Sequence, residues 1–212
     1  YVPADFSSAA FAIVGALTIP SSRIVLPSVG INQGRIGLLT TLNEMGAKIE
    51  MVRKNHERAE PIADLTINYS SLRGVVVPAD RAPSMIDEFP ILSVAAACAN
   101  GPTTMQGLKE LRVKESDRLA AIVEGLTASG IKTESTHDTL TIFGVDGKPQ
   151  GGNKNAIKTH FDHRIAMSFL VLGMCSNEPI KIDDSRSIMT SFPNFVALIN
   201  QVGGKISKLG NQ

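Results

Sequence analysis

A short run of charged residues, Arg112 to Arg118, is the first candidate for a chemical site in this sequence. It holds five charges in seven positions (RVKESDR) and leads into an apolar-striped segment that predicts a helix. Glu115 and Arg118 are three residues apart, which puts a carboxylate beside a guanidinium on one helix face. A solvated, salt-bridged helix start explains most runs of this kind. This pairing could also hold a general acid next to a bound anion.

Three cations, Lys114, Arg118 and Arg164, stand at or near predicted helix starts, and Arg35 is a candidate fourth. A helix N-terminus already carries partial positive charge, so a cation there is unfavourable by about 0.3–1 kcal/mol. If these helix starts converge, their backbone N–H groups, dipoles and cationic side chains attract the same oxyanion. The sequence therefore predicts a site for phosphate or carboxylate groups.

Aspartates precede three apolar runs of small residues, at Asp5, Asp87 and Asp162. Asp is a preferred helix N-cap because its carboxylate accepts free backbone N–H groups, and capping suffices to explain Asp5. The run THFDH at 159–163, which ends in His163, superficially resembles a metal-ligand cluster. No third remote ligand is evident, and no phosphate-binding or dinucleotide-binding glycine motif is present. Neither a metal nor another cofactor is therefore predicted.

The same aspartates open an internal repeat. A glycine follows each of them after 41, 43 and 41 residues, and an apolar residue lies four positions before each glycine. The pairs are Asp5 with Gly46, Asp87 with Gly130, and Asp162 with Gly203. Gly46 is expected to cap the C-terminus of a helix. The repeat units span about 5–80, 85–146 and 160–208.

Each unit is predicted to run helix, strand, helix, strand, and its first helix is apolar nearly all round, which suits burial on every side. Helices are expected at 7–17, 34–45, 91–97, 116–128, 165–172 and 193–201. Strands are expected at 23–26, 48–52, 65–69, 74–77, 103–106, 132–134, 139–143 and 180–182.

The predicted fold class is α/β (α+β). Three βαβαββ-type units could close into an inside-out, barrel-like single domain over 1–212, with helices inside and sheets outside. An open doubly wound sheet is the alternative for any chain that alternates helices and strands.

The composition excludes several classes of protein. With 43% hydrophobic and 19% charged residues in 212, the chain is globular rather than disordered or coiled-coil. Its net charge of +1 gives no overall basic field of the kind that binds nucleic acid or acidic membranes. No apolar stretch approaches the ~20 residues of a membrane span, and no signal peptide opens the chain. A cytoplasmic protein is expected, and because the sequence starts at Tyr1 rather than Met, part of a longer chain.

Four segments carry a resemblance to a known family: DFSSA (5–9), RAPSMIDEFP (81–90), LRVKESDRL (111–119) and DHRIAM (162–167). With them the chain resembles, from end to end, the C-terminal half of the 5-enolpyruvylshikimate-3-phosphate synthases, the 3-phosphoshikimate 1-carboxyvinyltransferases. The second and third segments are highly specific. In that family each half is an inside-out assembly of three repeated units, and helix N-termini of both halves point into the cleft between them.

The resemblance implies transfer of the enolpyruvyl group of phosphoenolpyruvate to the 5-hydroxyl of shikimate 3-phosphate, with release of phosphate, in aromatic amino acid biosynthesis. By resemblance, Asp87 grips and deprotonates the hydroxyl, and Glu115 donates and accepts the proton at the methylene carbon. Lys114 contacts shikimate 3-phosphate, and Arg118 and Arg164 bind phosphoenolpyruvate. The absent N-terminal domain is a further implied partner, so this chain alone is expected to have little turnover. The full enzyme is expected to be monomeric.

One departure and two alternatives stay open. Many members carry Lys before the Phe-Pro of the last helix, whereas this chain has Ser191, as in the glyphosate-tolerant Ser-Phe-Pro subgroup. Residues of the other half also set glyphosate sensitivity, so it is not predicted. One alternative function is a UDP-N-acetylglucosamine enolpyruvyl transferase-like domain, which the run KESDR at 114–118 argues against. The other is a non-catalytic anion-binding domain of the same fold.

Overall fold

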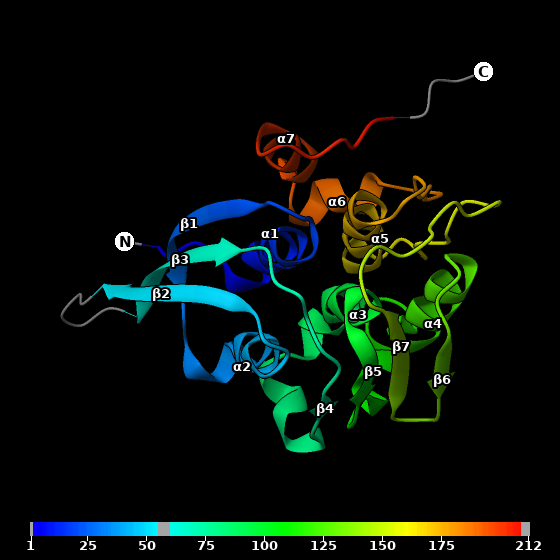
Figure 1. Cartoon of the computed structure of the whole chain (residues 1–212), viewed down its shortest axis with the longest axis horizontal. Helices are drawn as coiled ribbons and strands as arrows, with labels where there is room; N and C mark the ends of the chain where they lie inside the picture. Colours follow the sequence, from blue (N-terminus) through cyan, green and yellow to red (C-terminus); the bar gives the residue numbers. More distant parts are fainter. Residues whose placement is uncertain (1, 55–59, 209–212) are drawn as a thin grey trace.

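The computed structural model describes residues 2–54 and 60–208, in which helices and strands are interspersed up to residue 145 and helices alone follow (Figure 1). The helices are α1 (Phe6–Thr18), α2 (Gly37–Glu44), α3 (Phe89–Cys98), α4 (Arg118–Ala128), α5 (His163–Cys175), α6 (Arg186–Ser191) and α7 (Phe195–Gln201). Short 3-10 helices cover Gln33–Arg35, Ala79–Ser84, Ile86–Glu88 and Lys109–Val113. The mixed α/β class is confirmed. None of the helices described has the length and apolarity needed to cross a membrane.

The strands form two sheets. They are β1 (Arg23–Gly30), β2 (Lys48–Lys54), β3 (Ile62–Asn68), β4 (Val76–Val77), β5 (Asn100–Met105), β6 (Thr133–Ser135) and β7 (Leu140–Val145). The first sheet is antiparallel in the order β1-β3-β2. The second has the order β4-β5-β7-β6, with β4 parallel to β5 and the other pairs antiparallel. Figure 1 shows the two sheets on different sides of the central helices.

The strand expected at 180–182 is wrong, because Ile182 forms only an isolated bridge with Ile157. The side chain of Asn153 takes the place of a neighbouring strand there. Its Oδ1 accepts from the N–H of Lys181 at 3.0 Å, and its Nδ2 donates to the carbonyl of the same residue at 3.0 Å. The Ile157 N–H also donates to this carbonyl, at 2.8 Å, so a side chain and a single bridge together satisfy the backbone groups of Lys181 without a ladder.

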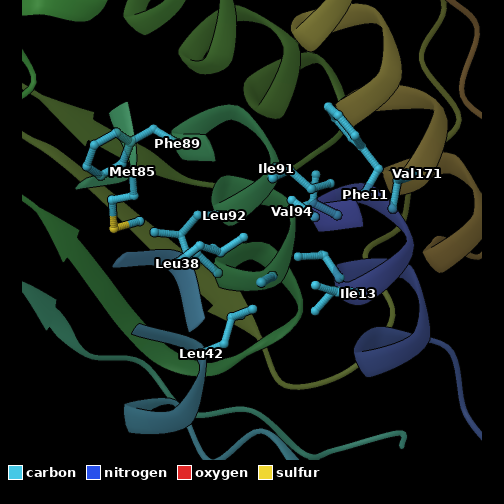
Figure 2. Packing of buried hydrophobic residues seen from close by; sticks show 14 of the residues in the cluster. Phe11, Ile13, Leu38, Leu42, Met85, Phe89, Ile91, Leu92, Val94 and Val171 are labelled. Carbon is cyan, nitrogen blue, oxygen red and sulfur yellow. The ribbon is translucent and has the colours of Figure 1, made fainter. Parts of the chain in front are cut away.

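The three apolar helices α1, α3 and α5 pack on one another at the centre of the molecule (Figure 1). Every residue of α3 is buried, as the all-round apolar pattern predicts. Side chains of all three helices meet in this core, among them Phe11, Ile91, Val94 and Val171 (Figure 2). Burying each such side chain stabilises the fold by about 1.5–3 kcal/mol. The fully enclosed α3 can therefore present only its ends to solvent, whereas α1 and α5 each keep a partly exposed side.

The helices α2, α4 and α7 end in the same backbone motif. Gly46, Gly130 and Gly203 follow them with positive φ angles of 93°, 79° and 104°. The residue after each glycine donates its N–H to the carbonyl four positions before the glycine: Ala47 to Leu42, Ile131 to Leu126, and Gly204 to Ile199. This is the Schellman motif, so the C-cap expected at Gly46 is confirmed.

Two of the three expected aspartate caps are observed. Asp5 accepts a backbone N–H of the first turn of α1 at 2.8 Å, and Asp162 accepts one of α5 at 2.9 Å. The cap expected at Asp87 is wrong: the residue lies in the 3-10 helix Ile86–Glu88, and α3 begins two residues later. Its carboxylate accepts instead from the Arg118 guanidinium, a stronger donor than a neutral backbone N–H.

Helices α4 and α5 approach closely at Gly125. A Cβ atom added there would overlap the ring of Phe169, a buried side chain on α5. Gly125 lies seven residues after Arg118, on the same face of α4. Because Gly125 has no side chain, α4 can lie close enough to α5 for Arg118 to reach the start of α5.

Gly125→Ala is therefore expected to destabilise the protein, even though Ala favours a helix over Gly by about 1 kcal/mol. Overpacking against the Phe169 ring costs about 1–3 kcal/mol, and the overlap here is deep, so a net loss of about 1–2 kcal/mol is expected in urea unfolding. In a Phe169→Leu background the same substitution should cost less.

The matched control is Gly15→Ala in α1, where an added Cβ would meet Val171 Cγ1 at 3.7 Å, an ordinary contact. This substitution should leave stability unchanged or raise it by up to about 1 kcal/mol. Equal effects of the two substitutions would contradict the close approach at Gly125.

Candidate functional site

The structure brings together all five residues that the sequence analysis assigned to a site. They are Asp87, Lys114, Glu115, Arg118 and Arg164, and ion pairs join each of them to at least one other. They come from three segments: the 3-10 helix before α3, the entry to α4, and the first turn of α5. Residues up to 77 positions apart in the sequence therefore form one charged cluster.

Arg118 is the centre of this cluster and is fully buried. Its Nε donates to Asp162 at 2.8 Å, its Nη1 to Asp87 at 2.8 Å, and its Nη2 to Glu115 at 2.5 Å. Burial disfavours the charged guanidinium, but the three carboxylates outweigh burial and raise the pKa of Arg118 above its ordinary value. Each nitrogen of this buried cation thus has an anionic partner.

Asp162 joins the start of α4 to the start of α5. Besides capping α5, its buried carboxylate accepts from Arg118 and from Ser116 Oγ, the latter at 3.1 Å. Burial raises the pKa of Asp162, but the hydrogen-bond donors lower it by more, so its net pKa lies below the ordinary value. The preceding His160 and Phe161 have positive φ angles of 51° and 57°, which is uncommon for such residues. This sharp turn sends the chain into α5 with the carboxylate facing both partners.

Asp87 lies among three cations. Arg118 Nη1 is 2.8 Å from its carboxylate, Lys114 Nζ 3.7 Å, and Arg164 Nη2 3.8 Å. Burial raises the pKa of Asp87, but the three cations together lower it more, so the net pKa falls below the ordinary value. With a side chain that is 39% exposed, Asp87 is an ionised acceptor that a ligand can reach.

Lys114 and Glu115 precede α4 rather than belong to it. The helix expected from 116 starts at Arg118, because Asp117 caps it by accepting from the N–H of Ala120 at 2.9 Å. Lys114 Nζ lies 3.1 Å from a carboxylate oxygen of Glu110. Glu115 is 53% exposed and is held by Arg118. Both side chains therefore stand on a connecting segment at the edge of the cluster.

Arg164 lies in the first turn of α5. Its Nη1 donates to the backbone carbonyl of Asp87 at 3.1 Å and lies 3.5 Å from Glu88 Oε1. The sequence analysis missed Glu88, although an acid directly before an all-apolar helix was a visible signal. Arg35, the candidate fourth cation, pairs instead with Asp5 at 3.3 Å. It reaches the cluster only through a bond to Ser7 Oγ at 3.1 Å.

His163 and the other candidate metal ligands do not form a metal-binding group. In residues 2–54 and 60–208, no three His, Cys, Asp or Glu side chains are placed to hold a metal ion. Burial and the adjacent Arg164 lower the pKa of His163, so its imidazole is neutral at pH 7. Ser191, where the resemblance implied Lys in many family members, is the exposed last residue of α6.

Two curated relatives of this chain carry the same name. The 3-phosphoshikimate 1-carboxyvinyltransferase of Paramagnetospirillum magneticum is 57% identical over 206 residues, which are 97% of this chain and 46% of that protein. The protein of the same name from Rhodospirillum rubrum is 54% identical and covers 97% of this chain and 45% of its own length. This chain therefore spans about half the length of the curated relatives it matches.

Solved structures agree with these relatives. The EPSP synthase from Acinetobacter baumannii matches with a TM-score of 0.88 and 40% identity, over 98% of this chain and 48% of that one. The enolpyruvyl transferase NikO from Streptomyces tendae matches with a TM-score of 0.74 over 95% of this chain and 43% of that one. At 17% identity it shows a shared fold alone.

The description "EPSP synthase (3-phosphoshikimate 1-carboxyvinyltransferase)" belongs to the family model that matches residues 1–199. That match covers nearly the whole chain, including every residue of the charged cluster. The chain belongs to the EPSP synthase family.

Proposed function

We propose that this chain is the C-terminal half of an enzyme that transfers the enolpyruvyl group of phosphoenolpyruvate to the 5-hydroxyl of shikimate 3-phosphate and releases phosphate. This is a step of the shikimate pathway, which leads to the aromatic amino acids. One observation carries the proposal beyond family membership: Lys114, Arg118 and Arg164 gather around Asp87 and Glu115. Both substrates are anions, and the proton transfers at the hydroxyl and at the methylene carbon need a general base and a general acid, which the two carboxylates can supply.

In the proposed complex, Arg118 and Arg164 bind the carboxylate and phosphate of phosphoenolpyruvate, and Lys114 binds the phosphate of shikimate 3-phosphate. Guanidinium groups suit this task because their fork of donors matches two oxyanion oxygens at once. Arg118 already has three carboxylate partners. A bound anion must therefore displace the two accessible ones, Asp87 and Glu115, which frees both acids for chemistry.

The proton transfers balance over two steps. In the first, Asp87 takes the proton of the 5-hydroxyl, whose oxygen bonds to the enol carbon of phosphoenolpyruvate, and protonated Glu115 gives a proton to the methylene carbon. In the second, Glu115 takes a proton back from the resulting methyl group, the carbon–oxygen bond to phosphate breaks, and the double bond forms again. The hydroxyl proton held by Asp87 leaves with the phosphate or through solvent.

The low pKa of Asp87 makes it a weak base in the absence of ligand, because Arg164, Arg118 and Lys114 stabilise its charge. Anions bound to the same cations would compensate that positive charge. The pKa of Asp87 then rises, and its strength as a base increases at the moment when the substrates are in place.

The fold supports a more detailed architecture as well. We infer an inside-out assembly of three units, in one domain over 1–212, because the three central helices come one from each unit and the following helices share one C-terminal motif. An N-terminal half built in the same way would complete the site. We call the full-length protein, or a chimera that joins the N-terminal half of the Paramagnetospirillum magneticum relative to this chain, the two-half protein.

This chain alone is expected to show little or no turnover, because half of the ligands to both substrates would be missing. Phosphate release from phosphoenolpyruvate and shikimate 3-phosphate measures it, with the two-half protein as the positive control. Robust turnover by the 212 residues alone would contradict the proposed division of the site.

Glu115→Gln in the two-half protein should lower turnover by about 10²–10⁴-fold, the usual contribution of a general acid–base group. Binding of phosphoenolpyruvate, measured by calorimetry, should change far less, because the cations remain. The control is Glu134→Gln, an exposed carboxylate on β6 that pairs with Lys132. Normal turnover of the Glu115 variant would remove this residue from the chemistry. Anion binding without turnover in the unchanged two-half protein would favour the non-catalytic alternative.

The pKa of Asp87 is expected to rise when phosphoenolpyruvate saturates the two-half protein, because the ligand compensates Arg118 and Arg164. A ¹³C NMR titration of its carboxyl carbon, assigned with Asp87→Asn, measures this shift. Asp64 is the control, since its pKa is lowered by a hydrogen bond from Lys54, away from the cluster, and should not respond. An unchanged or lower pKa of Asp87 in the complex would contradict the exchange of partners.

A further inference from the structure

Glu88 is a buried carboxylate that none of these chemical steps uses. Its side chain is 5% exposed, and Ser7 Oγ donates to its Oε1 at 2.5 Å. The same oxygen lies 3.5 Å from Arg164 Nη1. A buried charge is costly unless it is paired and hydrogen-bonded, and Glu88 has both kinds of partner. Glu88 therefore lies beside Arg164, a cation of the proposed phosphoenolpyruvate site, and this position suggests a function for it.

Glu88 stands where the three central helices begin. Ser7 lies in the first turn of α1, Glu88 is the residue before α3, and Arg164 lies in the first turn of α5. Helix N-termini carry partial positive charge, which stabilises a carboxylate. The same three helix starts therefore hold the Glu88 charge in place and leave it beside Arg164.

Arg164 depends on few fixed partners. Its guanidinium donates to the backbone carbonyl of Asp87 at 3.1 Å and lies 3.8 Å from the Asp87 carboxylate. That carboxylate is proposed to turn to the substrate hydroxyl during the reaction. Glu88 takes no part in the chemistry and cannot turn away, because it is enclosed. Its attraction for the guanidinium therefore persists through the cycle.

We propose that Glu88 is a positioning residue that holds the Arg164 guanidinium at the helix starts, in the orientation that binds phosphoenolpyruvate. This inference rests on the proposed role of Arg164 in binding phosphoenolpyruvate. It adds a selective effect: Glu88 acts on the affinity for phosphoenolpyruvate, and other residues carry out the proton transfers and bind shikimate 3-phosphate.

The charge of Glu88 makes this positioning depend on pH. Burial raises the pKa of Glu88, and Asp87 on the same 3-10 helix adds to the rise, while Ser7, Arg164 and Arg35 offset it only in part. As the pH falls through this raised pKa, Glu88 becomes neutral and loses its attraction for Arg164. The KM for phosphoenolpyruvate should then rise at acidic pH.

The test uses Glu88→Gln in the two-half protein, because Gln keeps the size of the side chain and can still accept from Ser7. At pH 8 the KM for phosphoenolpyruvate should rise about five- to tenfold, as expected for loss of one charge-assisted contact. The kcat and the KM for shikimate 3-phosphate should stay within about twofold. In this variant, the part of the rise in the KM for phosphoenolpyruvate at acidic pH that comes from protonation of Glu88 should also disappear.

Two further variants separate charge from packing. Ser7→Ala removes the neutral partner of Glu88 but leaves the charge beside Arg164, so at pH 8 the KM for phosphoenolpyruvate should change by less than about twofold. Glu88→Asp keeps the charge on a shorter side chain and should give a smaller rise in KM than Glu88→Gln. If Glu88→Gln does not fold, the KM of Glu88→Asp and its pH dependence decide the question.

Several outcomes would overturn the inference. A lower melting temperature of Glu88→Gln with an unchanged KM for phosphoenolpyruvate would make Glu88 purely structural. Equal rises in the KM for phosphoenolpyruvate and the KM for shikimate 3-phosphate would contradict a selective effect of Glu88 on phosphoenolpyruvate. If the unchanged two-half protein lacked turnover, the proposed function would fail. Crystal structures of that protein and of its Glu88→Gln variant would then test the position of Arg164 without a measurement of activity. The Arg164 guanidinium should move away from the Asp87 carbonyl in Glu88→Gln, and an unmoved guanidinium would refute positioning.

Discussion

The site depends on the ion pairs of the buried Arg118 guanidinium. A fully enclosed cation is tolerated only when anions surround it, and removing one partner of a buried ion pair typically costs about 3–5 kcal/mol. Its three carboxylates come from the segment before α3, from the entry to α4, and from the cap of α5. The fold must therefore bring these three segments together before the charge can be buried. The close approach of α4 and α5 at Gly125 serves this requirement.

The carboxylates around the cations divide into two kinds by exposure. Asp162 and Glu88 are enclosed, at 0% and 5% exposure, while Asp87 and Glu115 are 39% and 53% exposed. The three cations of the cluster form ion pairs with five carboxylates once the partners Glu88, Glu110 and Asp162 are included, so the cluster with these partners has no net positive charge. A ligand anion can compete with the accessible acids but not with the enclosed ones. Further positive charge must then come from the helix N-termini and from the proposed second half.

The sequence predicted elements well where a local signal decides them, and less well where a tertiary partner does. The apolar helices and the C-cap at Gly46 follow from periodicity and from the need for a positive φ. The cap at Asp87 failed because a remote Arg118 binds that carboxylate. The strand predicted at 180–182 is absent because the side chain of Asn153 and a single bridge to Ile157 satisfy its backbone groups. The place of Glu88 before an all-apolar helix was visible in the sequence, but its contact with Arg164 depends on the packing of three helices and could not be predicted.

The burial of the central helices explains why the site lies at their starts. The fully enclosed α3 offers only its ends to a ligand, and the polar side chains of α1 and α5 nearest to it lie at the same N-terminal end. The N-terminal ends carry partial positive charge and present Ser7, Glu88 and Arg164 together. The opposite ends carry partial negative charge, and there Thr18 Oγ1 and Cys175 Sγ lie 2.8 Å apart, both buried. The helix dipoles of α1, α3 and α5 thus favour an anion at their N-terminal ends and disfavour one at the opposite ends, which agrees with the position of the charged cluster.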